Sequence, residues 1–435
     1  MGKSQRLFYC NRTTNNTRLV MERQILAIGD TGAQLVSKFN TNFALTNYPT
    51  IYFVEAYKLD SDPDDTLSIQ RCIDDMPDSV QFQAGGGLIM LDAKTYTISS
   101  TITIPKSICI IGAGSDSGTR IFLSANSDCN MLEIGKRDSA QPISVTLQGI
   151  RIEMHETQAD GYHNVKTFNY LRHCHFVDLF VIRATAENWL MTRDDVGALP
   201  RNNYFYGCAF EYGKGHSVKV SHDYNLNFTS CYFGFGQDAS YGLYVAMAAK
   251  HLVISNCWWL TFNLAGGLTI FNAQNVHIVN NCFDGSEGCN AGSAHIRLAG
   301  CDNVNIGGNI VHAGDHPYAI RLDSGNTKVR VYDNQWLSYS TAPYFFSDKA
   351  VVKCYNNSMM LGKEQDHEGL ATIPDESAYV EVTHSIFTTP DNVLATPQGN
   401  EAIWVSNIGA TTFRINRAGS SGALVCNWKA GILTY

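Results

Sequence analysis

The sequence predicts an all-β chain: a right-handed parallel β-helix, which is a single-stranded solenoid, with a short N-terminal capping helix and a C-terminal β-sandwich-like domain. Two observations predict the solenoid. The phrase NNYFYGCAFEYG (residues 202–213) returns in five further copies, and the slots that align between copies lie 23 to 28 residues apart. Apolar and polar residues alternate within each copy, which is the period of a β-strand. Repeats of roughly 20–50 residues are typical of stacked architectures.

One slot of the repeated phrase is always Cys or Asn. Because coils of a β-helix stack at the ~4.8 Å spacing of β-strands, identical slots form columns along the axis. Buried Asn amides then hydrogen-bond along the column, and Cys fits as a small buried residue. We therefore predict a structural, inward-facing column, since no CxxC pair indicates a metal or redox cluster. Its members are Cys208, Cys231, Cys257, Asn281, Asn309, Asn334 and Asn357.

Composition excludes several classes of protein. With 44% apolar and 17% charged residues the chain is not a disordered one. A net charge of −8 without a long basic run argues against a nucleic-acid partner. No secretory signal or membrane span is expected, because no apolar run is long enough. Thirteen cysteines without disulfide-like spacing predict free thiols and synthesis in a reducing cytoplasm.

Residues 54–114 contain a recognisable order of motifs. The pair Asp64-Asp65 precedes a short amphipathic helix at 66–76, and Gly85-Gly86-Gly87, a strand, the run TITIP and Gly112-Ala113-Gly114 follow. This segment resembles the N-terminal part of the pectate-lyase-like β-helix superfamily, especially phage tailspikes and tail-fibre depolymerases. Either Asp of the pair can cap the helix, which then plugs the open end of the solenoid.

The resemblance implies a division of the chain. Residues 1–53 are an N-terminal segment or adapter, and residues 54–368 are the β-helix with its cap. Residues 369–435 contain short strands with frequent turn signals, which favours a β-sandwich. They resemble a small C-terminal domain of phage tail proteins, whose role is trimerisation or glycan contact. GLATIPDES (369–377) is expected to be the linker.

The function implied by the resemblance is that of a phage tailspike. We expect a homotrimer in the virion, attached to the phage tail or baseplate, that recognises and depolymerises a capsule, O-antigen or exopolysaccharide at the host cell surface. No cofactor, metal, nucleic-acid or membrane partner is expected. Outward apolar residues suit burial between subunits. They are Trp258, Leu260, Phe262 and Tyr244.

Most glycosidases use two carboxyl groups, so acids in outward columns are the candidate catalytic residues. Glu287 and Asp315 fall in one column on adjacent coils, beside Asp284. In register they would lie roughly 5–6 Å apart, near the ~5–5.5 Å of a retaining pair. Their like charges would split their pKa values. We predict Glu287, Asp315 and Asp284 as catalytic, with Asp238 and Glu211 as weaker alternatives.

Cationic and polar residues near these acids are the candidate substrate contacts. Arg297 and Arg321 align on the next strand and would hold an anionic sugar, or would pair with the acids as a surface network. A polysaccharide lyase using these arginines, and a non-catalytic receptor-binding spike, are the alternatives to hydrolysis, which is favoured. The predicted substrate-binding residues are His312, Arg297, Arg321, His295 and Asn263.

Overall fold

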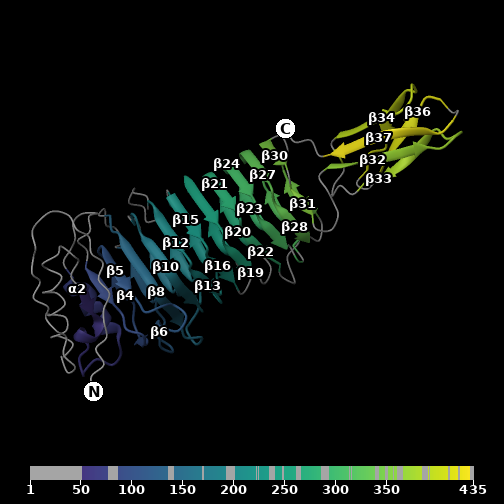
Figure 1. Ribbon diagram of the computed structural model, residues 1–435. Coiled ribbons are helices and arrows are strands. Elements are labelled where there is room, and N and C mark those ends of the chain that lie inside the picture. Colours follow the sequence, from purple (N-terminus) through teal and green to yellow (C-terminus); the bar gives the residue numbers. More distant parts are fainter. Residues whose placement is uncertain are drawn as a thin grey trace, which may run out of the picture.

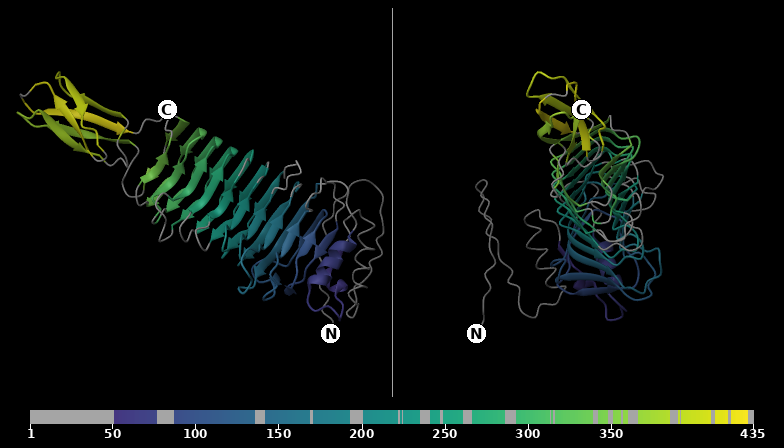
Figure 2. Two further views of the ribbon diagram at one scale, coloured as in Figure 1. Left: turned by 180° about the vertical axis from the view of Figure 1, so that it is seen from behind. Right: turned by 90° about the vertical axis from the view of Figure 1, so that its right-hand side faces the viewer.

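The computed structural model describes most of the chain from residue 51 to residue 431, so the segment 1–53 lies almost entirely outside the described residues. The gaps are 77–86, 136–141, 169–170, 193–200, 222, 224, 235–240, 247–248, 261–265, 286–292, 313, 315, 339–341, 348–350, 356, 360–365, 385–389, 391, 410–411 and 420–421. Parallel strands stack along one axis into a long solenoid, and a smaller antiparallel unit follows at its C-terminal end (Figures 1 and 2).

The larger sheet of the solenoid has 21 parallel strands. In most coils the chain makes two of these strands in succession, separated by a bend, whereas β8 and β10 pass through the bend without a break. The strands are β1 (Ile51–Phe53), β2 (Leu88–Met90), β3 (Thr95–Ile98), β5 (Ile108–Ile111), β6 (Thr119–Leu123), β8 (Val145–Met154), β10 (His175–Ile182), β12 (Asn203–Tyr206), β13 (Ala209–Glu211), β15 (Asn225–Thr229), β16 (Tyr232–Gly234), β18 (His251–Ser255), β19 (Trp258–Leu260), β21 (Gln274–Val279), β22 (Cys282–Asp284), β24 (Asp302–Gly307), β25 (Ile310–His312), β27 (Thr327–Tyr332), β28 (Gln335–Ser338), β30 (Val352–Tyr355) and β31 (Ser358–Met359).

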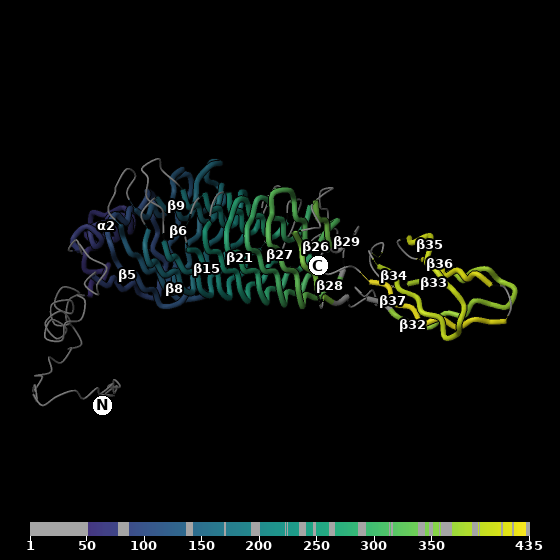
Figure 3. The backbone as a smooth tube through the Cα atoms, turned by 90° about the horizontal axis from the view of Figure 1, so that it is seen from above, coloured from purple at the N-terminus to yellow at the C-terminus, as the bar shows by residue number. Residues whose placement is uncertain are grey.

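The smaller sheet has ten parallel strands and completes each coil. It receives one strand from each coil, after the strands that the coil gives to the larger sheet. Its strands are β4 (Ile102–Ile104), β7 (Leu132–Ile134), β9 (Val165–Thr167), β11 (Trp189–Met191), β14 (Val218–Val220), β17 (Tyr241–Val245), β20 (Gly266–Phe271), β23 (Ala294–Ala299), β26 (Tyr318–Leu322) and β29 (Ala342–Phe346). The coils remain in register along the axis (Figure 3).

The Cys/Asn column lies at the bend of the larger sheet and is buried, as predicted. Asn281 and Asn309 each donate their side-chain amide to the next Asn, at 2.9 and 2.8 Å. The residue before each slot turns the chain with a positive φ, which Gly, Asn and Asp adopt most readily. These bend residues are Gly207, Ser230, Asn256, Asn280, Gly308 and Asp333.

The interior of the solenoid is a stack of aromatic rings continued by branched aliphatic side chains. Phe233 stacks on Trp259 at 4.8 Å and Trp259 on Phe283 at 4.5 Å between ring centroids. All three are buried, because the alternation of each strand sends every second side chain inward. The repeated aromatic slot of the sequence is therefore the core.

The N-terminal end of the solenoid is covered by α2 (Thr66–Asp75), preceded by a short 3₁₀ helix, η1 (Val54–Tyr57). The carboxylate of Asp64 accepts the backbone N–H of Thr66 at 2.8 Å, so it satisfies a free donor of the first turn. Ile69 and Ile73 of α2 are buried in the solenoid core. The predicted capping helix is thereby confirmed, and the side chain of Asp64, rather than that of Asp65, is hydrogen-bonded to its first turn.

The C-terminal unit contains two antiparallel three-stranded sheets that share a separate hydrophobic core around Phe413 and Trp428. The predicted linker 369–377 is wrong in part, because Gly369 to Ile373 belong to β32 and pair with β37 along their whole length. The strands are β32 (Asp366–Ile373), β33 (Tyr379–Thr383), β34 (Asn392–Pro397), β35 (Ile403–Ser406), β36 (Thr412–Arg417) and β37 (Leu424–Gly431).

Candidate functional site

The outer face of the larger sheet has a row of apolar and aromatic side chains after the bend, of which Trp258 and Ile310 are exposed and the others half-buried. Register pairs place one residue of each coil in this row, and the aromatic ones stand where a sugar chain laid along the axis would contact them. Trp258 is 51% exposed, and its ring meets that of Tyr232 edge-on at 6.2 Å between centroids. We call Phe180, Ala209, Tyr232, Trp258, Cys282 and Ile310 the outer row.

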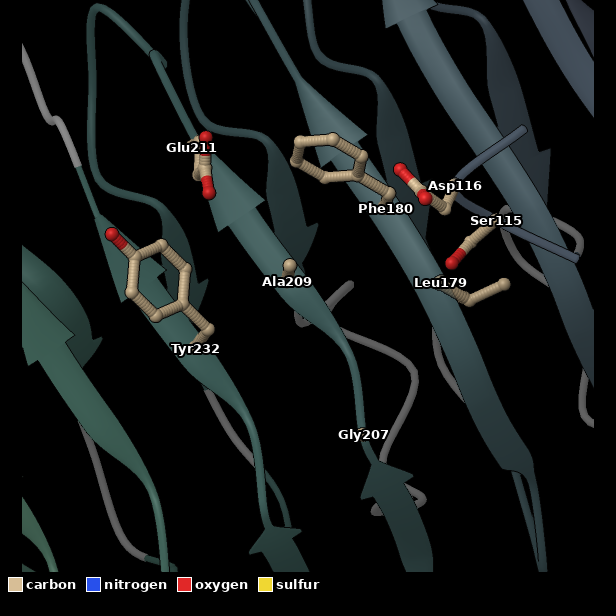
Figure 4. Close-up of a pocket in the computed structure, with 8 residues that line it drawn as sticks. All are labelled: Ser115, Asp116, Leu179, Phe180, Gly207, Ala209, Glu211 and Tyr232. Atoms are coloured by element: carbon tan, nitrogen blue, oxygen red, sulfur yellow. The ribbon is translucent and has the colours of Figure 1, made fainter.

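A depression of about 330 Å³ lies at the N-terminal end of the outer row, where Phe180 and Ala209 form its floor (Figure 4). In Figure 4 the ring of Phe180 lies between the carboxyl groups of Glu211 and Asp116. A sugar resting on this ring would therefore have a carboxyl group on each side. The lining residues are Ser115, Asp116, Leu179, Phe180, Gly207, Ala209, Glu211 and Tyr232.

The loop that supplies Asp116 begins at the Gly112-Ala113-Gly114 motif. A Cβ at Gly112 would come within 2.3 Å of the backbone oxygen of Gly149, so only glycine lets the loop approach the next coil. The loop then reaches the coil beyond, where the Ser115 hydroxyl donates to the carboxylate of Asp178 at 2.8 Å. The glycine motif, which the sequence analysis assigned to the fold, therefore also positions one wall of the depression.

Glu211 differs from an ordinary surface carboxylate. Burial raises its pKa, and the positive charge of Arg151 offsets this only in part. Its protonated form therefore persists to higher pH than that of a free glutamic acid, as a proton donor requires.

Tyr232 completes the depression beside Glu211. Burial, and then the negative charge of Glu211, raises the pKa of Tyr232 to about 12, so the phenol remains a neutral hydrogen-bonding group. The ring folds over Gly234, where a Cβ would stand 2.6 Å from it. Gly234 is the register neighbour of Glu211, so the missing side chain lets the phenol lie next to the carboxyl group.

Three arginines surround one carboxylate on the coils just before the depression. Glu153 is buried, and its carboxylate forms ion pairs with Arg151 at 2.7 Å, with Arg120 at 2.9 Å and with Arg183 at 2.9 Å between nitrogen and oxygen. The guanidinium carbon of Arg151 also lies 4.9 Å from the centroid of the Phe180 ring. We call Arg120, Arg151, Arg183 and Glu153 the arginine cluster.

Among the predicted catalytic residues, Asp284 is on the outer face in the same register column as Glu211. It accepts a hydrogen bond from, or pairs with, His312 at 3.0 Å, so these two predicted residues are brought together. Gly234 and Leu260 separate Asp284 from Glu211 in that column. Three strand spacings amount to ~14 Å. Asp284 and Glu211 are thus too far apart to act on one glycosidic bond, which needs at most ~9.5 Å.

One of the predicted substrate contacts on the smaller sheet is not at the surface. His295 is buried, with its ring 4.4 Å from that of His316 and 5.9 Å from that of Phe283, so its prediction as a surface contact is wrong. Alternation is not kept at the start of β23, where Ala294, His295 and Ile296 are all buried.

Arg297 and Arg321 are register partners, as predicted, and both bind Asp323 at 2.7 Å. They lie on the smaller sheet, whereas Asp284 and His312 lie on the larger one. Burial by itself would lower the pKa of Arg297, but the hydrogen bonds and the charges of Asp323 and Tyr241 together outweigh burial and raise the pKa. The raised pKa disfavours the neutral guanidine form, which Arg297 would need in order to act as a base.

Several predicted residues lie outside the described residues, namely Glu287, Asp315, Asp238 and Asn263. Within the described ranges, no group of three His, Cys, Asp or Glu side chains is arranged to hold a metal ion. In the same part of the chain, no helix has the length and apolarity needed to cross a membrane.

Sequence reasoning did not identify Asp116 or the arginine cluster, and it considered Glu211 only as an alternative. Asp116 follows a recognised glycine motif, but nothing in the repeat shows that its loop reaches the depression. The arginines have a visible signal, because Arg120 and Arg151 occupy equivalent positions on paired strands.

Comparison with known proteins agrees with this architecture. Residues 194–359 match the family described as the right handed beta helix region. No functionally characterised protein matches the sequence significantly. The pre-mature gene product 12 of bacteriophage phi29 is 12% identical, with a TM-score of 0.50 over 71% of this chain and 45% of that one.

Two phage tailspikes are also similar in structure. The tailspike protein gp49 of Pseudomonas phage LKA1 is 11% identical over 81% of this chain and 68% of that one, with a TM-score of 0.46. A tailspike of an Acinetobacter baumannii bacteriophage, which is a capsular polysaccharide depolymerase, is 11% identical over 87% and 86%, with a TM-score of 0.38. Identities this low do not assign an activity to this chain. In its fold, the chain is a right-handed parallel β-helix protein.

Proposed function

We propose that the chain is a bacteriophage tailspike that binds a bacterial surface polysaccharide and hydrolyses its glycosidic bonds, with Glu211 as the proton donor. The observation that carries the proposal is a half-buried carboxyl group of raised pKa beside a depression with an aromatic floor, opposite a second carboxyl group. The resemblance of residues 54–114 to tailspikes supplies the biological setting.

The arrangement supports hydrolysis in three ways. A sugar chain along the outer row would stack on Phe180, Tyr232 and Trp258, which favours binding of carbohydrate. Protonated Glu211 would donate its proton to the leaving oxygen. Asp116 would act from the other side of the sugar, as base or as nucleophile.

A lyase mechanism is less well supported. It needs a base that removes a proton from a uronic acid, and the two arginines predicted for this role each bind Asp323. The product distinguishes the reactions, because a lyase leaves an unsaturated sugar that absorbs in the near ultraviolet and a hydrolase does not.

The test is depolymerisation of capsule and O-antigen preparations, with mass analysis of the products. We expect wild type to shorten one of them without near-ultraviolet absorption, and Glu211→Gln to be slower by roughly 10²–10⁴-fold, as for loss of a general acid. Glu381→Gln, an exposed glutamate of the C-terminal unit paired with Arg414, is the control and should keep full activity.

The same assay tests the pair predicted from the sequence. If Glu287→Gln and Asp315→Asn abolish cleavage while Glu211→Gln remains active, Glu211 is not the proton donor. If wild type binds a glycan but shortens none, the chain is a receptor-binding spike.

A further inference from the structure

The arginine cluster contains more positive charge than its fold requires. Three guanidinium groups meet the one carboxylate of Glu153, so three positive charges and one negative charge leave two positive charges uncompensated. A single arginine would suffice to pair the buried acid. The side chains of Arg120, Arg151 and Arg183 are 35%, 27% and 49% exposed, so the excess charge faces solvent.

The donors that remain have the geometry of an anion site. Arg120 and Arg151 both contact Glu153 through Nε. Across the described residues, no hydrogen bond engages their terminal Nη atoms. Arg183 contacts Glu153 through Nη1 alone. Guanidinium groups with such free ends bind carboxylates through paired, charge-assisted hydrogen bonds.

The cluster adjoins the depression directly. Arg120, Arg151, Phe180 and Ala209 are successive register partners on β6, β8, β10 and β13. A chain lying along the outer row would therefore pass from the arginines over Phe180 to Glu211 and Tyr232. Besides Glu153, the acids beside this path are Glu211, Asp116 and Asp178, and burial disfavours the charged form of Glu211.

We propose that Arg120, Arg151 and Arg183 form a subsite for the carboxylate of an acidic sugar, next to the sugar that lies over Phe180. The substrate is then an acidic polysaccharide, an inference that rests on the proposed function. Binding of the acidic sugar itself depends only on the cluster, so it can be measured without cleavage.

The experiment is a titration, followed by NMR, of the full chain with D-glucuronate and D-galacturonate, and with their methyl esters as neutral controls. We expect at least one acid to bind and its ester to bind at least about 10-fold more weakly. The double variant Arg120→Gln/Arg183→Gln should lose at least about 10-fold in affinity, because charge-assisted hydrogen bonds are removed. It keeps Arg151, which pairs with Glu153 and lies on Phe180.

Arg414→Gln is the matched control. Arg414 is also 35% exposed, pairs with a glutamate and lies 4.4 Å from an aromatic centroid, compared with 4.2 Å for Arg120. Its substitution should leave binding unchanged. Thermal unfolding of each variant shows whether a loss of binding reflects a loss of fold. Arg120→Lys keeps the positive charge but lacks the paired N–H donors of the guanidinium group, so it should bind with intermediate affinity.

The subsite is refuted if neither acid binds wild type, if the esters bind equally well, or if Arg120→Gln/Arg183→Gln binds as wild type does. The proposed function fails separately, when acids bind through the arginines but no polysaccharide is shortened. If the chain cleaves only neutral polysaccharides, the inference of an acidic substrate is refuted, whereas the proposed hydrolysis is not.

Discussion

Glu211 has a half-buried carboxyl group, and burial raises its pKa. Its raised pKa means that the folded chain favours the protonated carboxyl group more than the unfolded chain does. The folded state therefore loses stability as pH rises from the ordinary glutamate range through the raised pKa. Glu211→Gln removes this penalty, so we expect its melting temperature at neutral pH to be equal to or slightly above that of wild type, even as activity falls.

The pH profile of cleavage tests the same residue, because the direction of its shift in a variant can be predicted. A proton donor is lost as pH rises past its pKa, so the alkaline limb of the profile should report Glu211. Arg151 lowers that pKa, and Arg151→Gln should therefore move the alkaline limb to higher pH. Arg297→Gln, on the smaller sheet, should leave it in place. A limb that stays fixed in Arg151→Gln would mean that another group is the acid.

Gly234 tests the position of Tyr232 without altering any polar group. A methyl group at this position would overlap the phenol ring, which must then move away from Glu211. We expect Gly234→Ala to reduce cleavage by about 10-fold or more, while the fold is kept because the position is at the outer face. Gly399→Ala, whose nearest contact is at 3.4 Å, should be neutral. Wild-type rates in Gly234→Ala would show that the phenol has no role.

At the scale of elements, the solenoid is held together by contacts that repeat from coil to coil. Asn309 accepts the backbone N–H of Asn281 at 2.9 Å and donates to Asn334 at 2.8 Å and to the carbonyl of Ile278 at 2.9 Å. These bonds join successive coils at the bend, where the strands of the larger sheet are interrupted. The ladder therefore replaces the sheet hydrogen bonds that the bend breaks.

Asn309→Ala should lower the stability of the solenoid by about 3–5 kcal/mol, because each buried polar group left without a partner costs about 1–3 kcal/mol. The readout is the midpoint of unfolding in denaturant, followed by circular dichroism. Asn227→Ala is the control, since Asn227 is half-buried on the outer face and, within the described part of the chain, its side chain accepts a hydrogen bond only from Thr229. An equal loss in both variants would contradict a special role for the ladder.

At the scale of the whole molecule, exposed apolar residues indicate where copies of the chain would meet. Leu370 and Leu394 are 66% and 60% exposed on β32 and β34, which flank β37 in one sheet of the C-terminal unit. They share the outer face of that sheet, because their partners Asn427 and Lys429 both point outward. Such a face suits a subunit interface.

We expect light scattering to give three times the chain mass of 48.0 kDa for wild type. Leu370→Asp/Leu394→Asp should shift it toward the single-chain mass, because charges would have to be buried. Leu59→Asp, at a residue that is 53% exposed near the N-terminal cap, should remain assembled. A single-chain mass for wild type at micromolar concentration would refute the trimer.

The solenoid, its inward columns and its capping helix can be predicted from the amino-acid sequence alone. These features depend on contacts between equivalent positions of neighbouring repeats, so a periodic pattern is enough to predict them. Cys208 and Asn309 can be assigned a structural role from the sequence, because the same position is Cys or Asn in every copy of the repeated phrase. The bend at Gly207 and its equivalents also has a signature, since the residues that adopt positive φ precede each slot.

Which side chains lie together on the outer surface depends on the folded chain and cannot be read from the repeat. Asp116 meets the depression of Glu211 because its loop crosses one coil and is bonded to Asp178, and no periodicity encodes the reach of a loop. His295 is buried where alternation predicted exposure, because three successive side chains at the start of β23 are all buried. Asp284 shares a column with Glu211 yet stands three coils away. A repeat fixes what stacks inside the coil, whereas the site depends on distances between residues that the repeat treats as independent.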